Sequence, residues 1–420
     1  MQNLFLVFFT LIATLGNAQK KSLESKVLNV PKKKIVFIIV DGIATDQLKS
    51  AATPNLDAIA QNGSYSEAYV GGGTGTYNET PTISAVGYNS LLTGTWANKH
   101  NVFGNEIKNP NYNYPSIFRL YKDANPEGTI AVFSSWLDNR TKLVGDGLKQ
   151  TNTIKVDYNF DGLELDTINY PHDKLRDFMK RIDAAVADKA AKTIKEESPD
   201  VSWVYLEYSD DMGHGYGDSP QLEQAITFED AQIGKIWEAI QEREKATDED
   251  WLLLITTDHG RSEKDGKGHG GQTYRERSTW IVTNEKQTNK YFKSKNPAIV
   301  DLLPTMVDFL NMNVPLETKR EWDGVSLISP VDAFNLKAQK EGDMLKLTWE
   351  NLSKTKNKAK ILISTTNTFS SGGKDEYSLV KSISLDKQQL TIPLSEFSGK
   401  FTKIVLETPH TTLNTWWLAE

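Results

Sequence analysis

The sequence predicts an α/β protein whose first domain is a doubly wound, mostly parallel sheet with helices on both faces, followed by a small all-β domain. Two observations predict this. Short apolar runs alternate with amphipathic helical patterns from about residue 34 to 330. From residue 333 onward, short alternating segments are separated by Lys, Gly, Ser and Asn. We therefore expect a large domain over residues 30–330, which would carry the catalytic site, and a small β-sandwich-like domain over residues 333–420.

The predicted strands of the first domain are short, β-branched or aromatic, and apolar without alternation, as strands covered on both faces are. They span residues 34–40, 129–134, 202–208, 251–257 and 279–283. The helical patterns between them span residues 55–62, 84–93, 174–196, 221–244 and 298–310. The C-terminal strands are expected at residues 344–349, 360–364, 377–384, 389–393 and 403–407. Trp416 and Trp417 fit an edge strand packed on the first domain better than a carbohydrate-binding surface.

Composition restricts the location and the partners. Residues 1–18 contain an apolar stretch that ends in Gly16-Asn17-Ala18, which predicts a signal peptide cleaved near Ala18 and an exported, periplasmic or secreted protein. No later segment reaches the roughly 18–20 apolar residues of a transmembrane helix. The net charge of −7 argues against a surface that coats nucleic acid. Because the chain has no cysteine, any metal must be bound by nitrogen and oxygen donors, which suits zinc or manganese.

Three of the six histidines lie in clusters with Asp and Gly at the ends of apolar runs, and a further Asp-Gly pair closes the first run. Because the carboxyl ends of parallel strands meet at one edge of a sheet, these clusters are expected in one cleft. The spacing of Asp210 and His214 places both on one side of a helical turn or a tight loop. The set is sufficient for two divalent cations with three protein ligands each. Its members are Asp41, Asp210, His214, Asp258, His259 and His269.

Several stretches occur in the order found in a known superfamily. They are IVFIIVDG (35–42), TPNLDAIAQNG (53–63), SLLTGTWANKHNVFGN (90–105), YSDDMGHGYG (208–217), TTDHG (256–260), and DLLPTMVDFL with DGVSL (301–310 and 323–327). The chain resembles the alkaline phosphatase superfamily, and within it the type I phosphodiesterase/nucleotide pyrophosphatase branch. The resemblance implies that Asp41, Asp258 and His259 bind one metal, and Asp210, His214 and His269 the other. His269 follows His259 closely, whereas many nucleotide pyrophosphatases have their last histidine far downstream.

The resemblance also implies a hydroxyl nucleophile ten residues before Gly94, which is Ser84. The start of a helix there favours an anionic alkoxide and phosphate, and a metal would bind and activate the hydroxyl. Thr82 is the rival, because threonine is usual in this branch. Asn105 corresponds to the asparagine that donates to a phosphate oxygen. His100 is expected to have a structural role in its loop, and His172 to lie on the surface.

The substrate class follows from what the nucleophile region and its surroundings lack. Ser84 is not followed by the Pro and Arg of sulfatases, and the segment after residue 134 lacks the Lys-x-Arg pair of one monoesterase group. Trp136 resembles the aromatic residue of diesterases, and a phosphodiester suits such a pocket. We therefore expect a phosphodiesterase that acts on a small-molecule phosphate ester through a covalent phosphoserine.

Other functions stay open at this point. A phosphomonoesterase is the main alternative, because Arg140, Arg261 and Lys264 can supply positive charge, and Arg140 is counted with the substrate-binding residues. A sulfatase and a catalytically inactive binding protein are less favoured. A mutase is disfavoured because residues 105–200 are too few for a full cap. The sequence does not indicate the oligomeric state.

Overall fold

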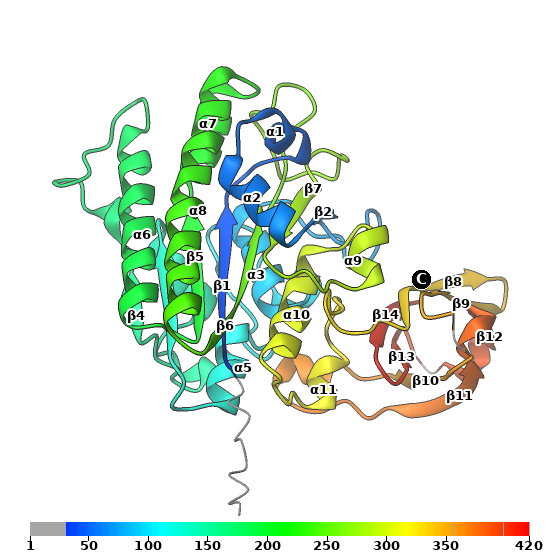
Figure 1. The fold of residues 1–420 in the computed structure, drawn as a ribbon. Helices are drawn as coiled ribbons and strands as arrows, with labels where there is room; N and C mark the ends of the chain where they lie inside the picture. Colours follow the sequence, from blue (N-terminus) through cyan, green and yellow to red (C-terminus); the bar gives the residue numbers. More distant parts are fainter. Residues whose placement is uncertain (1–30, 355, 398, 420) are drawn as a thin grey trace, which may run out of the picture.

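A seven-stranded sheet with the strand order β2-β7-β6-β1-β5-β3-β4 forms the centre of the N-terminal region (Figure 1). The computed structural model describes residues 31–354, 356–397 and 399–419, so the expected signal peptide lies outside the described residues. Five adjacent strands run parallel: β6 (Glu249–Thr256), β1 (Lys32–Val40), β5 (Val201–Leu206), β3 (Ile130–Ser134) and β4 (Tyr158–Phe160). This confirms the mostly parallel sheet.

The edge of the sheet beyond β6 differs from the prediction. Strand β7 (Ser278–Thr283) was predicted with the parallel strands, but it runs antiparallel to β6. The sheet ends with β2 (Ser64–Tyr69), which pairs antiparallel with β7. An apolar run that is buried on both faces has the same composition in either direction, so the pattern could not give the orientation.

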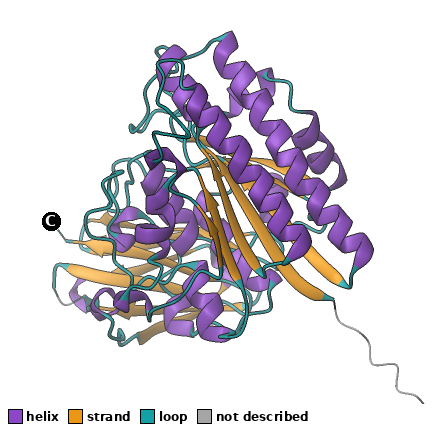
Figure 2. Cartoon of the chain, turned by 90° about the vertical axis from the view of Figure 1, so that its left-hand side faces the viewer, coloured by secondary structure: helices purple, strands orange, loops and turns teal. Residues whose placement is uncertain are grey.

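Helices cover both faces of the sheet. In β1, Ile35, Phe37 and Ile39 belong to one buried cluster with helices α3 (Ser84–Thr93), α5 (Ile117–Ala124) and α10 (Leu302–Phe309). The alternate residues Val36 and Ile38 belong to a second cluster with α2 (Pro54–Asn62), α6 (Asp177–Glu196) and α8 (Pro220–Ala246). Figure 2 shows long helices lying side by side across one face. Successive residues of a strand point to opposite faces, and here both faces are buried. The strands therefore appear in the sequence as continuous apolar runs.

The predicted helices are present with small shifts of their ends. Helix α8 begins where Ser219 accepts a hydrogen bond from the backbone N–H of Leu222 and Pro220 occupies the first turn. The predicted strand 202–208 ends earlier, at Leu206, and helix α7 (Tyr208–Tyr216) follows it. Asp210 and His214 therefore lie on a helical turn, the first of the two arrangements expected for them. The remaining helices are α1 (Thr45–Ser50), α4 (Ala97–His100), α9 (Lys290–Ser294) and α11 (Leu316–Lys319). None of the described helices combines the length and apolarity needed to cross a membrane.

The C-terminal region forms two antiparallel sheets, with strand orders β11-β10-β13-β14 and β12-β9-β8. Their strands are β8 (Ala333–Glu341), β9 (Met344–Asn351), β10 (Lys358–Ser364), β11 (Ser378–Ser384), β12 (Gln389–Pro393), β13 (Phe401–Glu407) and β14 (Thr412–Leu418). This confirms the small all-β part of the predicted fold class. Strand β14 is an edge strand, and its Trp416 stacks on Tyr77 with ring centroids 5.4 Å apart.

The apolar interior of the two regions is continuous. Leu345, Leu347 and Ile404 of the C-terminal sheets belong to the same buried cluster as Ile35 of the central sheet. A polar contact also joins the regions, because the buried ammonium of Lys99, which pairs with Asp323 at 2.6 Å within the N-terminal region, donates to Oδ1 of Asn414 in β14 at 2.8 Å. The β sheets therefore complete the core of the N-terminal region.

Candidate metal centre and active site

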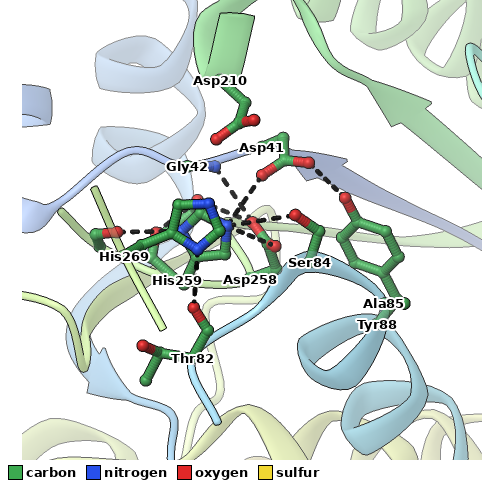
Figure 3. A network of polar contacts seen from close by, with 12 residues as sticks. Asp41, Gly42, Thr82, Ser84, Ala85, Tyr88, Asp210, Asp258, His259 and His269 are labelled. Carbon is green, nitrogen blue, oxygen red and sulfur yellow. Dashed lines mark hydrogen bonds and ion pairs between the residues drawn. The ribbon is translucent and has the colours of Figure 1, made fainter. Parts of the chain in front are cut away.

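Three carboxylates meet at the carboxyl edge of the sheet (Figure 3). Asp41 follows the last residue of β1, and Asp258 lies just beyond the end of β6. Asp210 lies in the first turn of α7, and His214 lies one turn later on the same helix. Because β5, β1 and β6 are neighbouring parallel strands, their ends bring these side chains together as predicted.

The inner half of the site is buried and consists of Asp41, Asp258 and His259. His259 Nε2 lies 3.3 Å from Asp41 Oδ1 and 3.3 Å from Asp258 Oδ2. Its other nitrogen, Nδ1, is 2.9 Å from the carbonyl oxygen of Gly260, so Nδ1–H donates there and Nε2 faces the carboxylates. Neither Asp41 Oδ1 nor Asp258 Oδ2 has a hydrogen-bond partner among the described residues.

The geometry of the inner half of the site fits a bound cation. Two buried carboxylates that lie this close together repel each other unless a positive charge lies between them. Ligand atoms bound tetrahedrally to zinc at about 2.0–2.1 Å lie about 3.3 Å from one another, which agrees with the separations found. The donor set and the unpartnered oxygens therefore fit a divalent cation.

The outer half of the site is formed by Asp210, His214 and His269. His214 Nε2 lies 3.3 Å from Asp210 Oδ2 and 3.1 Å from His269 Nε2. His269 Nδ1 is 2.9 Å from the carbonyl oxygen of Thr82, which orients its Nε2 toward His214 in the same way as Gly260 orients His259. Ligand atoms of these three residues lie close enough to hold one ion, and Asp210 is also within such a distance of Asp41 and His259. The two halves are therefore adjacent.

The charges of the inner half shift the pKa values of its own groups. Burial raises the pKa of Asp258 well above its usual value, and the charge of Asp41 adds to this. Burial opposes a charge on His259, but Asp258 and Asp41 raise the pKa of this histidine to about 9. Burial together with His259 lowers the pKa of His269 to about 3. The two buried carboxylates thus repel each other, and a cation between them would relieve this repulsion.

Two tyrosines that sequence reasoning missed orient Asp41. The hydroxyl of Tyr205 donates to Asp41 Oδ2 at 2.7 Å, and the hydroxyl of Tyr88 donates to the same oxygen. Asp41 Oδ1 is thereby left to face the site. A weak signal was present in the sequence, because Tyr88 lies one helical turn after Ser84 and Tyr205 is a polar-tipped residue at the end of an apolar strand.

The two hydroxyl candidates occupy different environments. Ser84 is the first residue of α3, and its Oγ lies 3.3 Å from His259 Nε2. The hydroxyl of Thr82 donates to the carbonyl oxygen of Gly271 and accepts from the N–H of Gly270, both at 2.9 Å. Thr82 thus holds the loop that carries His269, whereas Ser84 faces the buried metal-ligand candidates.

Asn105 and Trp136 both contact residues of helix α3, which begins at Ser84. Oδ1 of Asn105 accepts a hydrogen bond from the backbone N–H of Ala85 at 3.0 Å, which leaves the NH₂ group to donate to a ligand. Trp136 is half-buried and packs edge-on against Tyr88, with ring centroids 6.4 Å apart. Asn105 therefore binds the residue that follows Ser84, and Trp136 packs on the tyrosine that binds Asp41.

The arginines expected to meet substrate charge are paired with protein carboxylates instead. Arg140 donates to Asp161 at 2.6 and 3.0 Å and to Asp146 at 2.6 Å. Arg261 is fully buried and donates to Asp210 Oδ1 at 2.5 Å. Lys264 lies on the exposed loop between His259 and His269. No pattern in the sequence indicated that the two arginines would be bound internally.

The remaining histidines lie outside the site. His100 is buried, with Nε2 3.0 Å from Ser90 Oγ and Nδ1 accepting from the N–H of Val102, and burial lowers its pKa to about 3. His172 is exposed and stacks on Phe178, with ring centroids 4.2 Å apart. His410 lies 3.2 Å from Asp332 in the C-terminal region. His100 therefore has a structural place, and His172 lies on the surface, as expected for both residues.

The chain resembles known proteins in sequence and in structure. Among curated proteins, the 2,3-bisphosphoglycerate-independent phosphoglycerate mutase of Ehrlichia canis (strain Jake) is 30% identical over 150 residues, which span 35% of this chain and only 27% of the mutase. Among solved structures, inactive murine ectonucleotide pyrophosphatase/phosphodiesterase 5 in complex with AMP aligns with a TM-score of 0.49 and 14% identity over 67% of this chain and 96% of its own. The phosphonate monoester hydrolase of Agrobacterium radiobacter aligns with a TM-score of 0.48 and 14% identity over 92% of this chain and 89% of its own.

A family model gives the clearest match. The model of type I phosphodiesterase / nucleotide pyrophosphatase matches residues 35–351, which include every residue of the site described above. This match covers well over half of the sequence and agrees with the motifs that suggested the resemblance. The chain belongs to the type I phosphodiesterase/nucleotide pyrophosphatase family.

Proposed function

We propose that this protein is an exported two-metal phosphodiesterase that uses Ser84 as its nucleophile. The observation that carries the proposal is the convergence of three carboxylates and three imidazoles beside one serine hydroxyl, with two buried carboxylate oxygens left unpartnered. Family membership supports hydrolysis of phosphoric esters in general. The choice of a diester, of zinc and of a covalent intermediate is our inference.

In this proposal Asp41, Asp258 and His259 hold one cation together with Ser84. The outer cation is held by Asp210, His214 and His269. Bound there, two divalent cations supply positive charge that lowers the pKa of a hydroxyl or water and offsets charge on the phosphoryl group. Nitrogen and oxygen ligands with tetrahedral separations favour zinc, and manganese is the alternative.

The residues of the chain then act in two steps. Ser84 Oγ forms a bond to phosphorus while the bond to the leaving oxygen breaks, and the leaving alcohol takes up the proton that Ser84 gives up. Water next attacks the phosphoserine, Ser84 Oγ leaves and regains a proton, and a phosphate monoester is released. The NH₂ group of Asn105 donates to a non-bridging oxygen as charge develops on it.

A diester is favoured over a monoester because the arginines near the site are engaged elsewhere. Arg140 and Arg261 each bind protein carboxylates, so neither is available to neutralise the extra charge of a monoester dianion. Trp136 beside Tyr88 offers an apolar surface to the organic group of a diester. The monoesterase remains the second candidate, because the exposed Lys264 can supply positive charge.

The test compares initial rates on matched aryl phosphodiester, phosphomonoester and sulfate ester substrates, with zinc-loaded and metal-free protein. A diester preference that disappears with the metal is expected. A monoester preference would show that Lys264 or another cation reaches the dianion. A folded protein that binds no metal and turns over none of the three substrates would instead be a binding protein.

Export and the domain division are also proposed. Cleavage near Ala18 should give a mature N-terminus at Gln19 when the chain is made with an export pathway, as N-terminal sequencing would show. We place the catalytic domain at residues 30–330 and the small β-sandwich-like domain at residues 333–420. The change from the mixed sheet to β8, which begins at Ala333, supports this boundary.

A further inference from the structure

Arg261 is a fully buried arginine two residues after a metal-ligand candidate. Its Nε donates to the carbonyl oxygen of Gly42 at 2.8 Å, and its Nη2 donates to the carbonyl oxygen of Asp210 at 3.0 Å and to Asp210 Oδ1 at 2.5 Å. Nη1 is 3.5 Å from the carbonyl oxygen of Lys267. A buried guanidinium is costly unless it is paired and hydrogen-bonded, and here every nitrogen has a partner. Arg261 thus joins three of the segments that form the site.

Two glycines make the space for this guanidinium. A Cβ atom on Gly213 would lie 2.3 Å from Arg261 Cζ, and one on Gly42 would lie 2.5 Å from Nη2. Gly42 also has a φ of +68°, which favours glycine in any case. Gly42 follows Asp41, and Gly213 lies between Asp210 and His214, so the glycines of both motifs serve the same arginine.

The pairing leaves Asp210 with one free oxygen. Oδ1 is held by Arg261, whereas Oδ2 lies 3.3 Å from His214 Nε2 on the side of the outer cation site. We propose that Arg261 is a positioning residue that fixes Asp210 as a one-oxygen ligand of the outer cation. Arg261 touches neither substrate nor cation in this role, and the inference rests on the two-metal function proposed above.

The inner half of the site shares only the backbone of Gly42 with Arg261, because the N–H of Gly42 donates to Asp258 Oδ1 at 3.1 Å, and its other contacts are separate. Asp41 is oriented by Tyr88 and Tyr205, and His259 by the carbonyl oxygen of Gly260. Displacing the guanidinium should therefore weaken the outer cation and spare the inner one. A purely structural arginine would not produce this selective loss.

The experiment measures bound zinc by elemental analysis after dialysis, and zinc affinity by competition with a chelator, in four proteins. These are the wild type, Arg261→Lys, Gly213→Ala and Gly215→Ala. Arg261→Lys keeps the charge, but a single nitrogen cannot bond the carbonyl oxygens of Gly42 and Asp210 together with Asp210 Oδ1. The alanine at position 213 moves the guanidinium without removing any polar group. Gly215 lies on the same helix, and a Cβ there meets nothing within 4 Å, so Gly215→Ala is the matched control.

The wild type and Gly215→Ala should retain two equivalents of zinc. Arg261→Lys and Gly213→Ala should lose about one equivalent, with an affinity for the outer ion about 10–100-fold weaker and an unchanged affinity for the inner ion. Two equivalents with unchanged affinity in both variants would overturn the inference, as would loss of both ions from a folded Gly213→Ala protein. If Arg261→Lys does not fold, Gly213→Ala decides alone. Fewer than two equivalents in the wild type would instead refute the proposed function.

Discussion

The Oγ atom of Ser84 lies 3.3 Å from Nε2 of His259, although 175 positions separate the two residues in the chain. Ser84 begins helix α3 on one face of the sheet, and His259 follows strand β6 within it. The contact therefore depends on the packing of α3 against the sheet. It places a hydroxyl beside the inner group of metal-ligand candidates, at the positive end of a helix.

Removing this hydroxyl should abolish turnover without removing the metals. We expect Ser84→Ala to lower kcat by more than about 10³-fold, because no nucleophile would remain within reach of phosphorus. Zinc content should stay near two equivalents, since the six carboxylate and imidazole ligands are unchanged. Thr82→Ser, which keeps the hydroxyl that binds Gly270 and Gly271, is the control and should remain active. Wild-type rates in Ser84→Ala would refute the assignment.

Substitutions of Asn105 should separate its two hydrogen-bonding roles. Asn105→Asp keeps an acceptor for the N–H of Ala85 but replaces the donor NH₂ by a negative charge. We expect kcat to fall by at least about 10²–10³-fold, the range for one lost transition-state donor. Stability should change little, and thermal unfolding would check this. A normal kcat in Asn105→Asp would show that the amide does not contact the phosphoryl group.

The phenol groups on Asp41 should control the affinity of the inner cation. In Tyr205→Phe, Asp41 Oδ2 loses a donor at 2.7 Å, so its other oxygen is less firmly directed at the site. Zinc affinity at the inner site is expected to fall by about 10-fold or more, as measured by chelator competition. Tyr114→Phe is a suitable control, because the buried hydroxyl of Tyr114 has no partner among the described residues. Equal affinities in the two variants would contradict this role.

The buried carboxylate of Asp200 should make the fold sensitive to acid. Burial alone would raise its pKa, but hydrogen bonds from Lys32, from the N–H of Thr129 and from Lys34 lower the pKa of Asp200 to about 2. A depressed pKa stabilises the fold above the unfolded value of about 3.9, and this contribution is lost as the pH falls toward 2. For a shift of this size the contribution is about 2 kcal/mol.

Urea unfolding at several pH values would measure this contribution. Asp200→Asn should be less stable than the wild type above pH 5, and the difference should shrink as the pH approaches 2. Asp188→Asn, which removes an exposed carboxylate of α6, should follow the wild type at every pH. A constant difference between Asp200→Asn and the wild type would show that the carboxylate is not the titrating group.

Lys99 should stabilise the N-terminal region at the place where it meets β14. Its ammonium is buried and pairs with Asp323, whose side chain is 5% exposed. Lys99→Met should lower the free energy of unfolding by about 3–5 kcal/mol, because a buried carboxylate would be left without its partner. The exposed pair of Lys346 and Glu341 offers a comparison, and Lys346→Met should cost only about 0–1 kcal/mol. Denaturant titration would measure both values, and similar costs would count against a role for Lys99.

Much of the sheet was predictable, because buried parallel strands leave unbroken apolar runs and amphipathic helices leave a regular pattern between them. The strand β2 escaped because its sequence, SYSEAY, alternates small and polar residues at a sheet edge. The start and length of helix α7 could not be predicted, because it follows β5 after one residue and Tyr208 fits a continuation of the strand. Propensity does not resolve such a sharp change from strand to helix.

The metal-ligand candidates could be predicted because Asp and His, which commonly bind metals, follow the ends of the predicted strands. What could not be predicted is how its neighbours are paired. An arginine after a metal ligand usually faces solvent or substrate, and nothing local shows that Gly42 and Gly213 make a buried pocket for Arg261. The same is true of Arg140, which is bound by Asp146 and Asp161 from a separate loop. Such partners are set by tertiary structure.

The continuous core has a consequence for how the protein folds. Leu413 of β14 belongs to the same buried cluster as Ile35 of β1. Contacts between segments so far apart in the chain form slowly, because a long loop must close before the apolar surface is buried. The complete chain should therefore fold more slowly than a helical protein of similar length, whose contacts are mostly local.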